Sequence, residues 1–428
     1  MAVMKDSNMG WLGEIPYSWK LSKINSIYEL RNTKVSDYEY EPLSVTMQGI
    51  LPQLDSAAKT NAHDDRKLVQ KGDFVINSRS DRRGSCGVSP YDGSVSLINT
   101  VMKPRDEMNP DYYNWLFHTT QFADEFFKWG HGIVADLWTT NWQDMKHIDI
   151  PVPSLDEQKK IADYLDKIIP ELDALYFDIG KQIETLEEYK KSVITKTVTK
   201  GLNSDAPMKD SGVEWIGIIP EAWRYSRLGY ESYIRARLGW KGLKADEYVD
   251  EGYAFISAFN IQESRLVWEP LNYITKERYD ESPEIQLNVG DIIIVKDGAG
   301  VGKCARVDSL PLGGTAPNSS IGVITPYNDL EYRYLYYYLQ SAIFGNFVMK
   351  LLNGMGVPHL TQEVLRKINI LVPPKEEQIT ISDYLDKKVR KIDESISIKR
   401  EQLLVLENYK KTVIYEYVTG KREVPTHA

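Results

Sequence analysis

Residues 154–200, SLDEQKKIADYLDKIIPELDALYFDIGKQIETLEEYKKSVITKTVTK, return along the chain as residues 374–420, PKEEQITISDYLDKKVRKIDESISIKREQLLVLENYKKTVIYEYVTG. The two stretches align without a gap at a constant shift of 220, and 19 of the 47 paired positions are identical. Ordinary composition would give roughly three identities by chance. The chain therefore contains an internal duplication, and the repeated stretch organises the rest of the fold.

Both copies are predicted to form long amphipathic helices. Ser154 and Glu157 form a capping-box pattern, and Pro374 stands at or near the first helical position of the second copy. Pro170 interrupts the first copy, so we expect a short helix followed by a longer one over 171–200, roughly 45 Å long. Apolar residues spaced by three and four predict a coiled-coil-like stripe on each helix, and the two stripes would bury most simply against each other. The stripe residues are Ile161, Leu165, Ile168, Leu172, Leu175, Ile179, Ile183, Leu186, Tyr189 and Val193, then Leu385, Val389, Ile392, Ile396, Leu403, Leu406, Tyr409 and Val413.

A globular segment precedes each copy, and these two segments are related more loosely. WLGEIP at 11–16 matches WIGIIP at 215–220 with a shift of 204, whereas GDFVI at 72–76 matches GDIII at 290–294 with a shift of 218. Short β-rich runs alternate with aromatic helical runs, which predicts a mixed α/β (α+β) fold. The polar residues 201–212 predict a linker between the halves.

Length and composition bound the class of protein. A chain of 428 residues is too long to form one compact core, so two or more domains are expected. Its composition, with 42% hydrophobic and 26% charged residues, is typical of a folded globular protein. No apolar run resembles a signal peptide or membrane helix, so we expect a cytoplasmic protein and no membrane partner. The net charge of −9 argues against a uniformly basic DNA-binding domain. Cys86 and Cys304 are far apart, and we expect both to be core thiols.

Residues 297–304, DGAGVGKC, resemble a phosphate-binding loop but lack its requirements. Such a loop needs glycine where Asp297 stands and serine or threonine where Cys304 stands, so a glycine-rich hairpin is the preferred interpretation. The histidines lie singly, without metal-ligand spacing, and no catalytic motif is present. We therefore predict no catalytic residues, no metal and no cofactor.

Basic residues gather in loops of the globular segments, where they could neutralise phosphates or pair with guanine edges. For any one of them an ordinary solvated charge is equally compatible with the sequence. Segments 141–143 and 359–362 could present amides to bases, or cap the last helix of each segment. The predicted DNA-binding residues are Arg79, Arg82, Arg83, Arg235, Arg237, Lys241, Lys296 and Lys303.

The repeated WLGEIP and WIGIIP openings, the Pro-Val-Pro and Val-Pro-Pro exits, the Asp-Tyr-Leu-Asp helices and the Tyr-Lys-Lys helix ends together carry a resemblance. The chain resembles a specificity subunit of a type I restriction-modification enzyme over essentially its whole length. The resemblance implies a non-catalytic subunit with two target-recognition domains, each reading one half of a bipartite site in double-stranded DNA. It also implies two long antiparallel coiled-coil-like helices between them, a pseudo-twofold internal duplication, two docked methyltransferase (modification) subunits, and motor-nuclease (restriction) subunits that join through the complex.

The expected domain limits follow from the repeat and the resemblance: recognition domains at 1–153 and 207–373, a central spacer helix and linker at 154–206, and a C-terminal spacer helix at 374–428. Two alternatives stay open at this point. One is a duplicated scaffold that binds only proteins, and the other is an enzyme, either an NTPase through 297–304 or a nuclease. The helix residues predicted to dock partners are Tyr164, Leu165, Tyr189, Tyr384, Leu385 and Tyr409.

Overall fold

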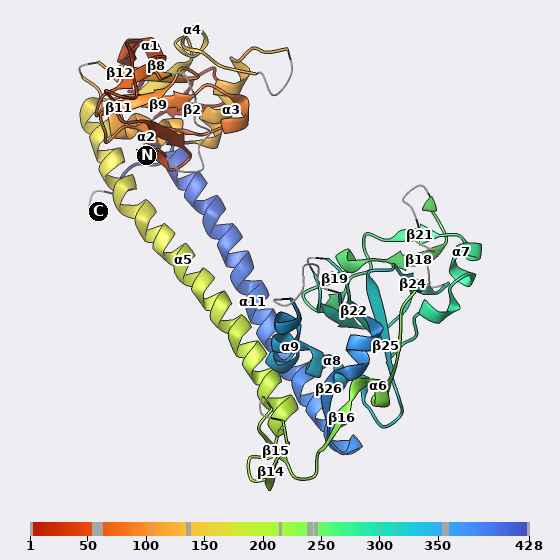
Figure 1. The fold of residues 1–428 in the computed structure, drawn as a ribbon. Helices are drawn as coiled ribbons and strands as arrows, with labels where there is room; N and C mark the ends of the chain where they lie inside the picture. The colour runs from red at the N-terminus through yellow and green to blue at the C-terminus, as the bar shows by residue number, and fades with distance from the viewer. Residues whose placement is uncertain are drawn as a thin grey trace. The chain divides into compact units, whose positions relative to one another are not determined.

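The computed structural model describes residues 3–53, 63–105, 107–133, 138–213, 216–237, 243, 247–298, 300–311, 313–352 and 359–425. The chain divides into two compact units, one formed by Met1–Gly180 with Glu401–Ala428 and the other by Lys181–Arg400. Each unit holds one globular head and the adjoining part of two long helices (Figure 1). The elements from β1 to β13 are called head 1, and those from β14 to β26 are called head 2.

Head 1 is built on an antiparallel sheet with the strand order β10-β9-β12-β4. A three-stranded sheet, β11-β8-β5, and the two-stranded ladders β6-β7, β1-β2 and β3-β13 complete its β structure. The strands are β1 (Met4–Asp6), β2 (Glu14–Pro16), β3 (Lys20–Lys23), β4 (Tyr28–Leu30), β5 (Lys34–Val35), β6 (Leu43–Thr46), β7 (Gly49–Pro52), β8 (Arg66–Val69), β9 (Phe74–Asn77), β10 (Cys86–Val88), β11 (Gly93–Ser96), β12 (Asn99–Pro104) and β13 (Asp149–Val152). The helices are α1 (Ile24–Ile27), α2 (Pro110–Phe117), α3 (Thr120–Lys128) and α4 (Trp142–Met145), with a short 3-10 turn at Ser80–Arg82.

Head 2 repeats this plan with the sheet β23-β22-β25-β17, a three-stranded sheet β21-β18-β24 and the ladders β19-β20, β14-β15 and β16-β26. The strands are β14 (Met208–Asp210), β15 (Ile218–Pro220), β16 (Arg224–Arg227), β17 (Ser232–Arg235), β18 (Tyr253–Ile256), β19 (Ile261–Gln262), β20 (Arg265–Leu266), β21 (Asn272–Ile274), β22 (Ile292–Val295), β23 (Cys304–Arg306), β24 (Thr315–Pro317), β25 (Ile321–Pro326) and β26 (Asn369–Val372). The helices are α6 (Leu228–Glu231), α7 (Lys276–Asp280), α8 (Tyr332–Gln340), α9 (Ala342–Leu352) and α10 (Gln362–Lys367).

The four-stranded sheets of the two heads share their register. Cys86 pairs with Ile76 across β10 and β9, and Cys304 pairs with Ile294 across β23 and β22, so both partners are displaced by 218. The three-stranded sheets differ, because β11 runs antiparallel to β8 whereas β24 runs parallel to β18. The predicted mixed α/β fold is confirmed, and the duplication extends through the central sheet of each head.

The helix α5 (Leu155–Lys200) is continuous through Pro170 and has 46 residues, about 69 Å. The predicted break at the proline is therefore wrong. A proline inside a helix costs about 3 kcal/mol. Ile161, Leu165 and Ile169 of the same helix are buried in the core of head 1, and full burial of each such side chain contributes about 1.5–3 kcal/mol. Tertiary packing therefore offsets the local cost of the proline.

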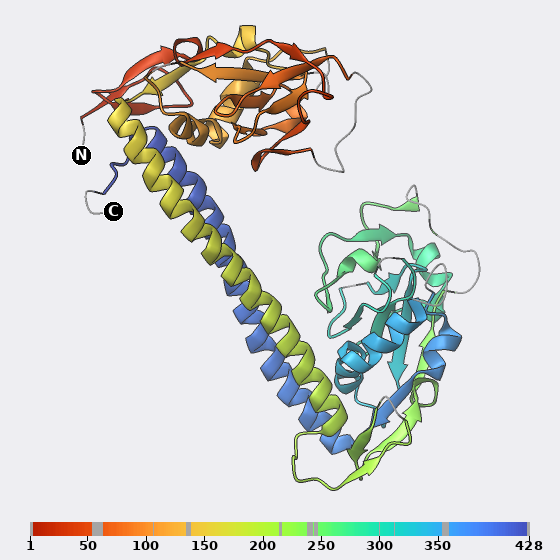
Figure 2. The ribbon, with the colours of Figure 1, turned by 60° about the vertical axis from the view of Figure 1, so that its left-hand side comes forward.

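The helix α11 (Lys375–Val418, 44 residues) lies beside α5 and runs antiparallel to it, as predicted (Figure 2). In one unit Lys410 pairs with Asp173, and in the other Lys190 Nζ lies 2.9 Å from Asp393 Oδ1. Each pair is the counterpart of the other at the shift of 220, with the two helices exchanged. Among the described residues, neither these helices nor any other is apolar enough over a sufficient length to cross a bilayer.

The predicted apolar stripes are buried or half-buried at most of their positions. Leu175, Tyr189 and Tyr409 are the exceptions, with exposed fractions of 48%, 46% and 46%. Next to each tyrosine, Lys190 or Lys410 turns inward to reach the aspartate of the opposite helix. A spacing of three or four residues cannot by itself decide which of two adjacent positions faces the partner helix.

Each head is tied to the start of one long helix by a duplicated tryptophan contact. Trp19 Nε1 donates to Glu157 Oε1 at 3.2 Å, and Trp223 Nε1 donates to Glu377 Oε2 at 2.9 Å. Both indole rings are buried. The repeated Glu-Gln motif at the helix starts therefore has a structural role in both units.

Each head also contacts the end of the other long helix through a buried tyrosine. Tyr112 of α2 donates its hydroxyl to the carbonyl of Val418 at 2.7 Å, and Tyr334 of α8 donates to the carbonyl of Val198 at 3.2 Å. The last carbonyls of a helix lack intrahelical partners, so these hydroxyls satisfy groups that would otherwise be buried unpaired. Each head is thus fixed to both helices of its own unit.

The two heads differ in charge where α2 or α8 meets its long helix. In head 2, Arg333 Nη1 donates to Asp383 Oδ1 at 2.7 Å and to Asp386 Oδ2 at 3.1 Å. The corresponding residues of head 1 are all acidic: Asp111, Asp163 and Asp166. The pKa of Asp111 is raised by burial and then by the charges of Asp166 and Asp163. Head 1 therefore carries an electrostatic repulsion that head 2 neutralises.

We expect Asp111→Asn to stabilise the unit that contains head 1 at pH 7 by a few tenths of a kcal/mol, since solvent screens this exposed group. A carboxyl whose pKa is raised in the folded state binds its proton more tightly when folded, so its charge destabilises the fold as pH rises through that pKa. The difference from the parent protein should therefore vanish near pH 3, below the ordinary value of 3.8. Hydrogen exchange of head 1 amides at pH 7 and near pH 3 measures this difference in stability. A variant Asp111→Asn that is less stable than the parent protein at pH 7 would contradict the prediction. Arg333→Gln is the opposite control and should destabilise head 2.

Candidate nucleic-acid interface

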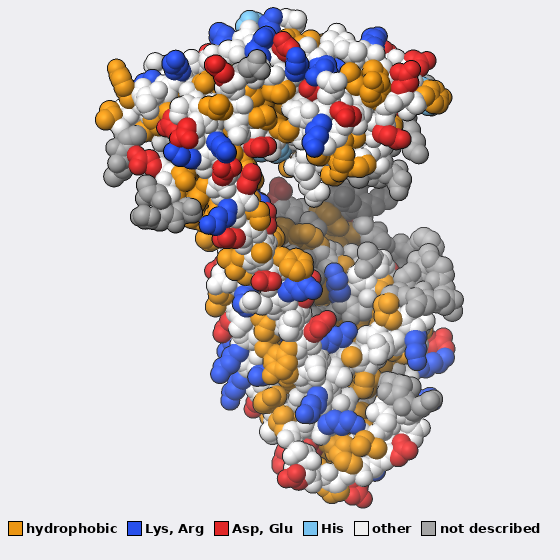
Figure 3. Space-filling view, turned by 90° about the vertical axis from the view of Figure 1, so that its left-hand side faces the viewer, with side chains coloured by type: hydrophobic (Ala, Val, Ile, Leu, Met, Phe, Trp, Pro, Cys, Tyr) orange, Lys and Arg blue, Asp and Glu red, His pale blue; other side chains and the backbone are white. Residues whose placement is uncertain are grey.

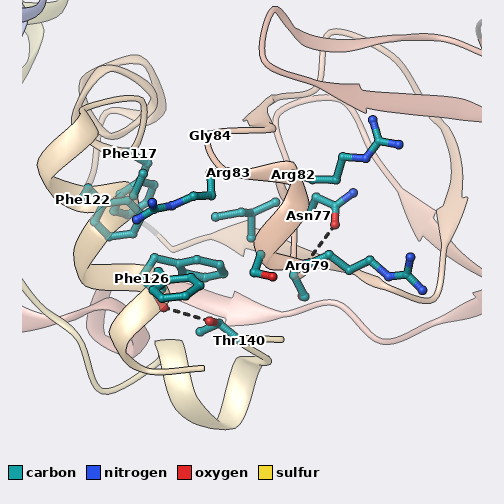
Figure 4. Close-up of a pocket in the computed structure, with 14 residues that line it drawn as sticks. Asn77, Arg79, Arg82, Arg83, Gly84, Phe117, Phe122, Phe126 and Thr140 are labelled. Carbon is teal, nitrogen blue, oxygen red and sulfur yellow. Dashed lines mark hydrogen bonds between the residues drawn. The ribbon is translucent and has the colours of Figure 1, made fainter. Parts of the chain in front are cut away.

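The hairpin loop between β9 and β10 presents three arginines at the surface of head 1. Arg79 and Arg82 extend away from the phenylalanines beneath the loop, whereas Arg83 turns toward them (Figure 4). Arg83 pairs with Asp124 and lies over the ring of Phe127, 4.8 Å from its centroid. Arg82 has only a loose pair with its neighbour Asp81, at 3.7 Å. The Arg79 guanidinium has no recorded ion pair among the described residues, so Arg79 and Arg82 are the more available cations.

Head 2 carries the equivalent hairpin between β22 and β23. Its strands pair antiparallel, and the Val295 amide donates to the carbonyl of Lys303 at 2.8 Å across the loop. A phosphate-binding loop leads from a strand into a helix, so the hairpin confirms the preferred interpretation of residues 297–304. At the shift of 218, Asp297 occupies the position of Arg79.

A hollow lies beside the hairpin in each head. In head 1 it is lined by the hairpin from Arg79 to Gly84 and by α3, whereas in head 2 it is lined by the end of the hairpin, by α9 and by Lys190, Lys191 and Ile194 of α5. Phe122 and Phe126 of α3 and Phe344 and Val348 of α9 are the apolar residues common to the two linings. The α9 residues stand at a shift of 222 from those of α3. The volume is about 20 Å³ in head 1 and about 410 Å³ in head 2. The surroundings of the hairpin therefore differ in shape between the two heads.

Arg235 is a structural residue, and its predicted contact with DNA is corrected here. Its side chain is 8% exposed and pairs at 2.6 Å with Asp291, whose side chain is fully buried. Arg31 and Asp73 form the corresponding pair in head 1, where Arg31 Nε donates to Asp73 Oδ2 at 2.6 Å. The pair therefore belongs to the duplicated core, and Arg235 has no free face to offer a base or phosphate.

The other predicted basic residues of head 2 have different surroundings. Arg237 is half-buried and donates from Nε to Ser282 Oγ at 3.3 Å, and burial followed by the neighbouring Arg278 lowers its pKa. Lys296 is half-buried with its carbonyl accepting from the Leu360 amide, and Lys303 is exposed on the hairpin. Lys241 lies outside the described residues.

The structure separates the predicted docking residues into two groups. Leu165 and Leu385 are fully buried in the cores of heads 1 and 2, so the prediction that they dock partners is wrong. Tyr164 is half-buried, with its ring 4.8 Å from that of Tyr417. The exposed members are Tyr189, Tyr384 and Tyr409.

On the face drawn in Figure 3, Lys and Arg side chains are interspersed with Asp and Glu and do not gather in one basic patch. Across the described ranges, no group of His, Cys, Asp and Glu is placed to hold a metal ion. Both cysteines are buried, as predicted, and burial raises the pKa of Cys304 to about 12.

Segments 141–143 and 359–362, which could either contact bases or cap a helix, act as helix caps. Asn141 caps α4 by accepting from the Gln143 amide at 2.7 Å, and Thr361 caps α10 by accepting from the Val364 amide at 3.2 Å. A pair that was not predicted joins His359 Nδ1 and Asp297 Oδ1, which lie 2.5 Å apart. The two residues are 62 positions apart, and a lone histidine offered no signal for the contact.

The chain is matched twice, over residues 16–185 and 240–407, by the family described as the type I restriction modification DNA specificity domain. The type I restriction enzyme MjaVIII specificity subunit of Methanocaldococcus jannaschii is 28% identical over 338 residues, covering 78% of this chain and 75% of that protein. The putative type I restriction enzyme MjaX specificity subunit of the same organism is 26% identical over 445 residues, covering 97% and 96%.

Two solved structures have the same fold. One is a chain from a structure described as the basis of complex assembly and conformational transition of the type I R-M system, with a TM-score of 0.74 at 15% identity, covering 95% of this chain and 99% of that one. The other is the HsdS subunit from Thermoanaerobacter tengcongensis, with a TM-score of 0.53 at 17% identity, covering 95% and 98%.

Proposed function

This chain belongs to the family of type I restriction-modification DNA specificity subunits, and from that premise we propose that each of its heads reads one half of a bipartite site in double-stranded DNA. Members of this family are non-catalytic recognition components that act within complexes with methyltransferase subunits. The recognition domains are assigned to 1–153 and 207–373, and the spacer regions to 154–206 and 374–428.

One observation carries the proposal: an equivalent hairpin stands on the same sheet in both heads, with different side chains. The loop from Arg79 to Gly84 holds three arginines and one aspartate, whereas the loop from Asp297 to Gly302 holds one aspartate, three glycines and no basic residue. A shared framework with divergent exposed loops suits two related surfaces that bind different sequences. Arginine, lysine and aspartate side chains are among those that distinguish base pairs in the major groove.

We propose that the long helices dock two methyltransferase subunits at equivalent positions, with motor-nuclease subunits joining through that complex. Tyr189 and Tyr409 support this assignment, because they are identical in the repeat and equally exposed. Tyr384 and the half-buried Tyr164 form a second repeated pair on the helices. Repeated surfaces of this kind fit two copies of one partner.

Methylome sequencing tests the proposal. The chain should be co-expressed with its methyltransferase subunit in a host without DNA methylation, with each protein expressed alone as the control. We expect one methylated motif made of two specified half-sites with an unread middle, and no motif from either protein alone. Methylation at an uninterrupted motif, or without any sequence preference, would contradict the reading by two heads.

A further inference from the structure

The hairpin position shared by Arg79 and Asp297 carries opposite charge in the two heads, although the framework around it is the same. Each residue comes three positions after an equivalent sheet-paired residue, which is Ile76 in β9 and Ile294 in β22. Each also forms an isolated bridge to the segment before the last helix of its head: Arg79 to Thr139, and Asp297 to His359. Thr139 and His359 are themselves related by the shift of 220, so the two sites occupy equivalent positions in the two heads.

The head 1 site is a hydrogen-bond donor only. A guanidinium has five N–H donors and no acceptor. Arg79 is exposed, its guanidinium has no recorded partner among the described residues, and Figure 4 shows it directed away from the core. Its neighbour Arg83 is held by Asp124 and Phe127, so Arg79 is better placed than Arg83 to meet a ligand.

The head 2 site presents acceptors. His359 Nδ1 meets Asp297 Oδ1 at 2.5 Å, which leaves the second carboxylate oxygen, Oδ2, without a partner recorded among the described residues. The Asp297 side chain remains 37% exposed and that of His359 58%, so this oxygen can reach a ligand from the surface. A carboxylate is repelled by DNA phosphates, and it therefore favours contact with the amino group of a base over contact with the backbone.

Given the proposed function, on which this inference rests, we propose that Arg79 specifies guanine in the half-site of head 1 and that Asp297 specifies cytosine in the half-site of head 2. Arginine pairs bidentately with guanine O6 and N7, whereas aspartate accepts from cytosine N4. Each residue then requires a G·C pair. Arg79 contacts the guanine of that pair in the half-site of head 1, and Asp297 contacts the cytosine in the half-site of head 2. Opposite charge on one framework is the means by which the duplicated heads read different sequences.

The test is methylome sequencing of the full complex with Arg79→Ala, Asp297→Asn or Lys303→Ala in this chain. Arg79→Ala should relax one guanine position of one half-site by roughly 5- to 150-fold and leave the other half-site unchanged. Asp297→Asn should relax one cytosine position of the other half-site and admit adenine, because asparagine pairs with adenine N6 and N7. Lys303→Ala is the control on the same hairpin and should lower methylation without changing the motif.

The outcomes separate this inference from the proposed function. A bipartite motif from the parent protein that neither Arg79→Ala nor Asp297→Asn changes would overturn the assignment of these residues and leave reading by two heads intact. Relaxation in the same half-site by both variants would also overturn it. Absence of a bipartite motif in the parent protein would contradict the proposed function itself. Continued recognition of the other half-site by each variant shows that the chain is folded.

Discussion

Replacing Asp291 by alanine should destabilise the unit of residues 181–400 by about 3–5 kcal/mol, which is the usual cost of leaving one partner of a buried ion pair uncompensated. Asp291 accepts from Arg235 Nη2 at 2.6 Å and from the Asn288 amide at 2.7 Å, and its side chain is fully buried. It also accepts from the Thr325 hydroxyl. Alanine would remove an acceptor shared by three donors and strand the Arg235 charge in the core.

Native-state hydrogen exchange should be used to measure this effect, because a chain with two units need not unfold in one transition. Amides of β22 and β25 should lose protection in Asp291→Ala. The control is Asp308→Ala in the same head, which removes a half-exposed partner of Arg306 and should cost less than about 1 kcal/mol. If Asp291→Ala lowers the free energy of unfolding no more than this control does, the ion pair of Arg235 is not a structural element. Arg235 would then no longer be excluded from DNA binding.

Leu385→Ala should destabilise the same unit by about 2–5 kcal/mol, the usual range for removing a fully buried leucine side chain. Leu385 lies on α11 within the core of head 2, together with Trp223 and Tyr334. Its truncation should therefore weaken the attachment of the head to the helix. Any loss of methyltransferase binding in this variant would be a consequence of unfolding.

Tyr384→Ala is the matched control, because Tyr384 is the adjacent residue and is 40% exposed. It should leave hydrogen exchange of head 2 unchanged within about 0.5 kcal/mol, as surface substitutions usually do. If the proposed docking holds, it should weaken the association of the methyltransferase subunit measured by calorimetry. A variant Leu385→Ala with parent-like protection and no partner binding would restore Leu385 as a docking residue.

Local signals were sufficient for the features that recur in the chain. The repeat at a shift of 220 predicted both long helices and their packing against each other, and the family resemblance implied that they are antiparallel. The pairs Asp173–Lys410 and Lys190–Asp393 confirm both expectations. The departures of residues 297–304 from a phosphate-binding loop predicted a hairpin, which β22 and β23 form. These features depend on periodicity and motif spacing, which a sequence displays directly.

Exposure and long-range partners could not be predicted in the same way. Arg235 and Arg79 are both arginines near strand ends, yet only one of them meets a buried aspartate, 56 positions away. Leu165 and Leu385 fit an apolar stripe equally well whether the stripe faces a head or a partner protein. Pro170 predicts a break in the helix from the local sequence alone, but the helix continues through it because neighbouring residues are buried in the core of head 1.

Repetition and periodicity are properties of the order of residues, so they were sufficient to identify a duplicated chain with two related heads and two equivalent helices. The availability of each charge to a ligand, in contrast, followed from the folded arrangement of the chain. That arrangement assigned Arg235 to the core, left Arg79 exposed and joined Asp297 to His359 across 62 residues. The physical reason is that burial and pairing depend on which distant segments the fold brings together, and the free energy of a charge depends on those neighbours.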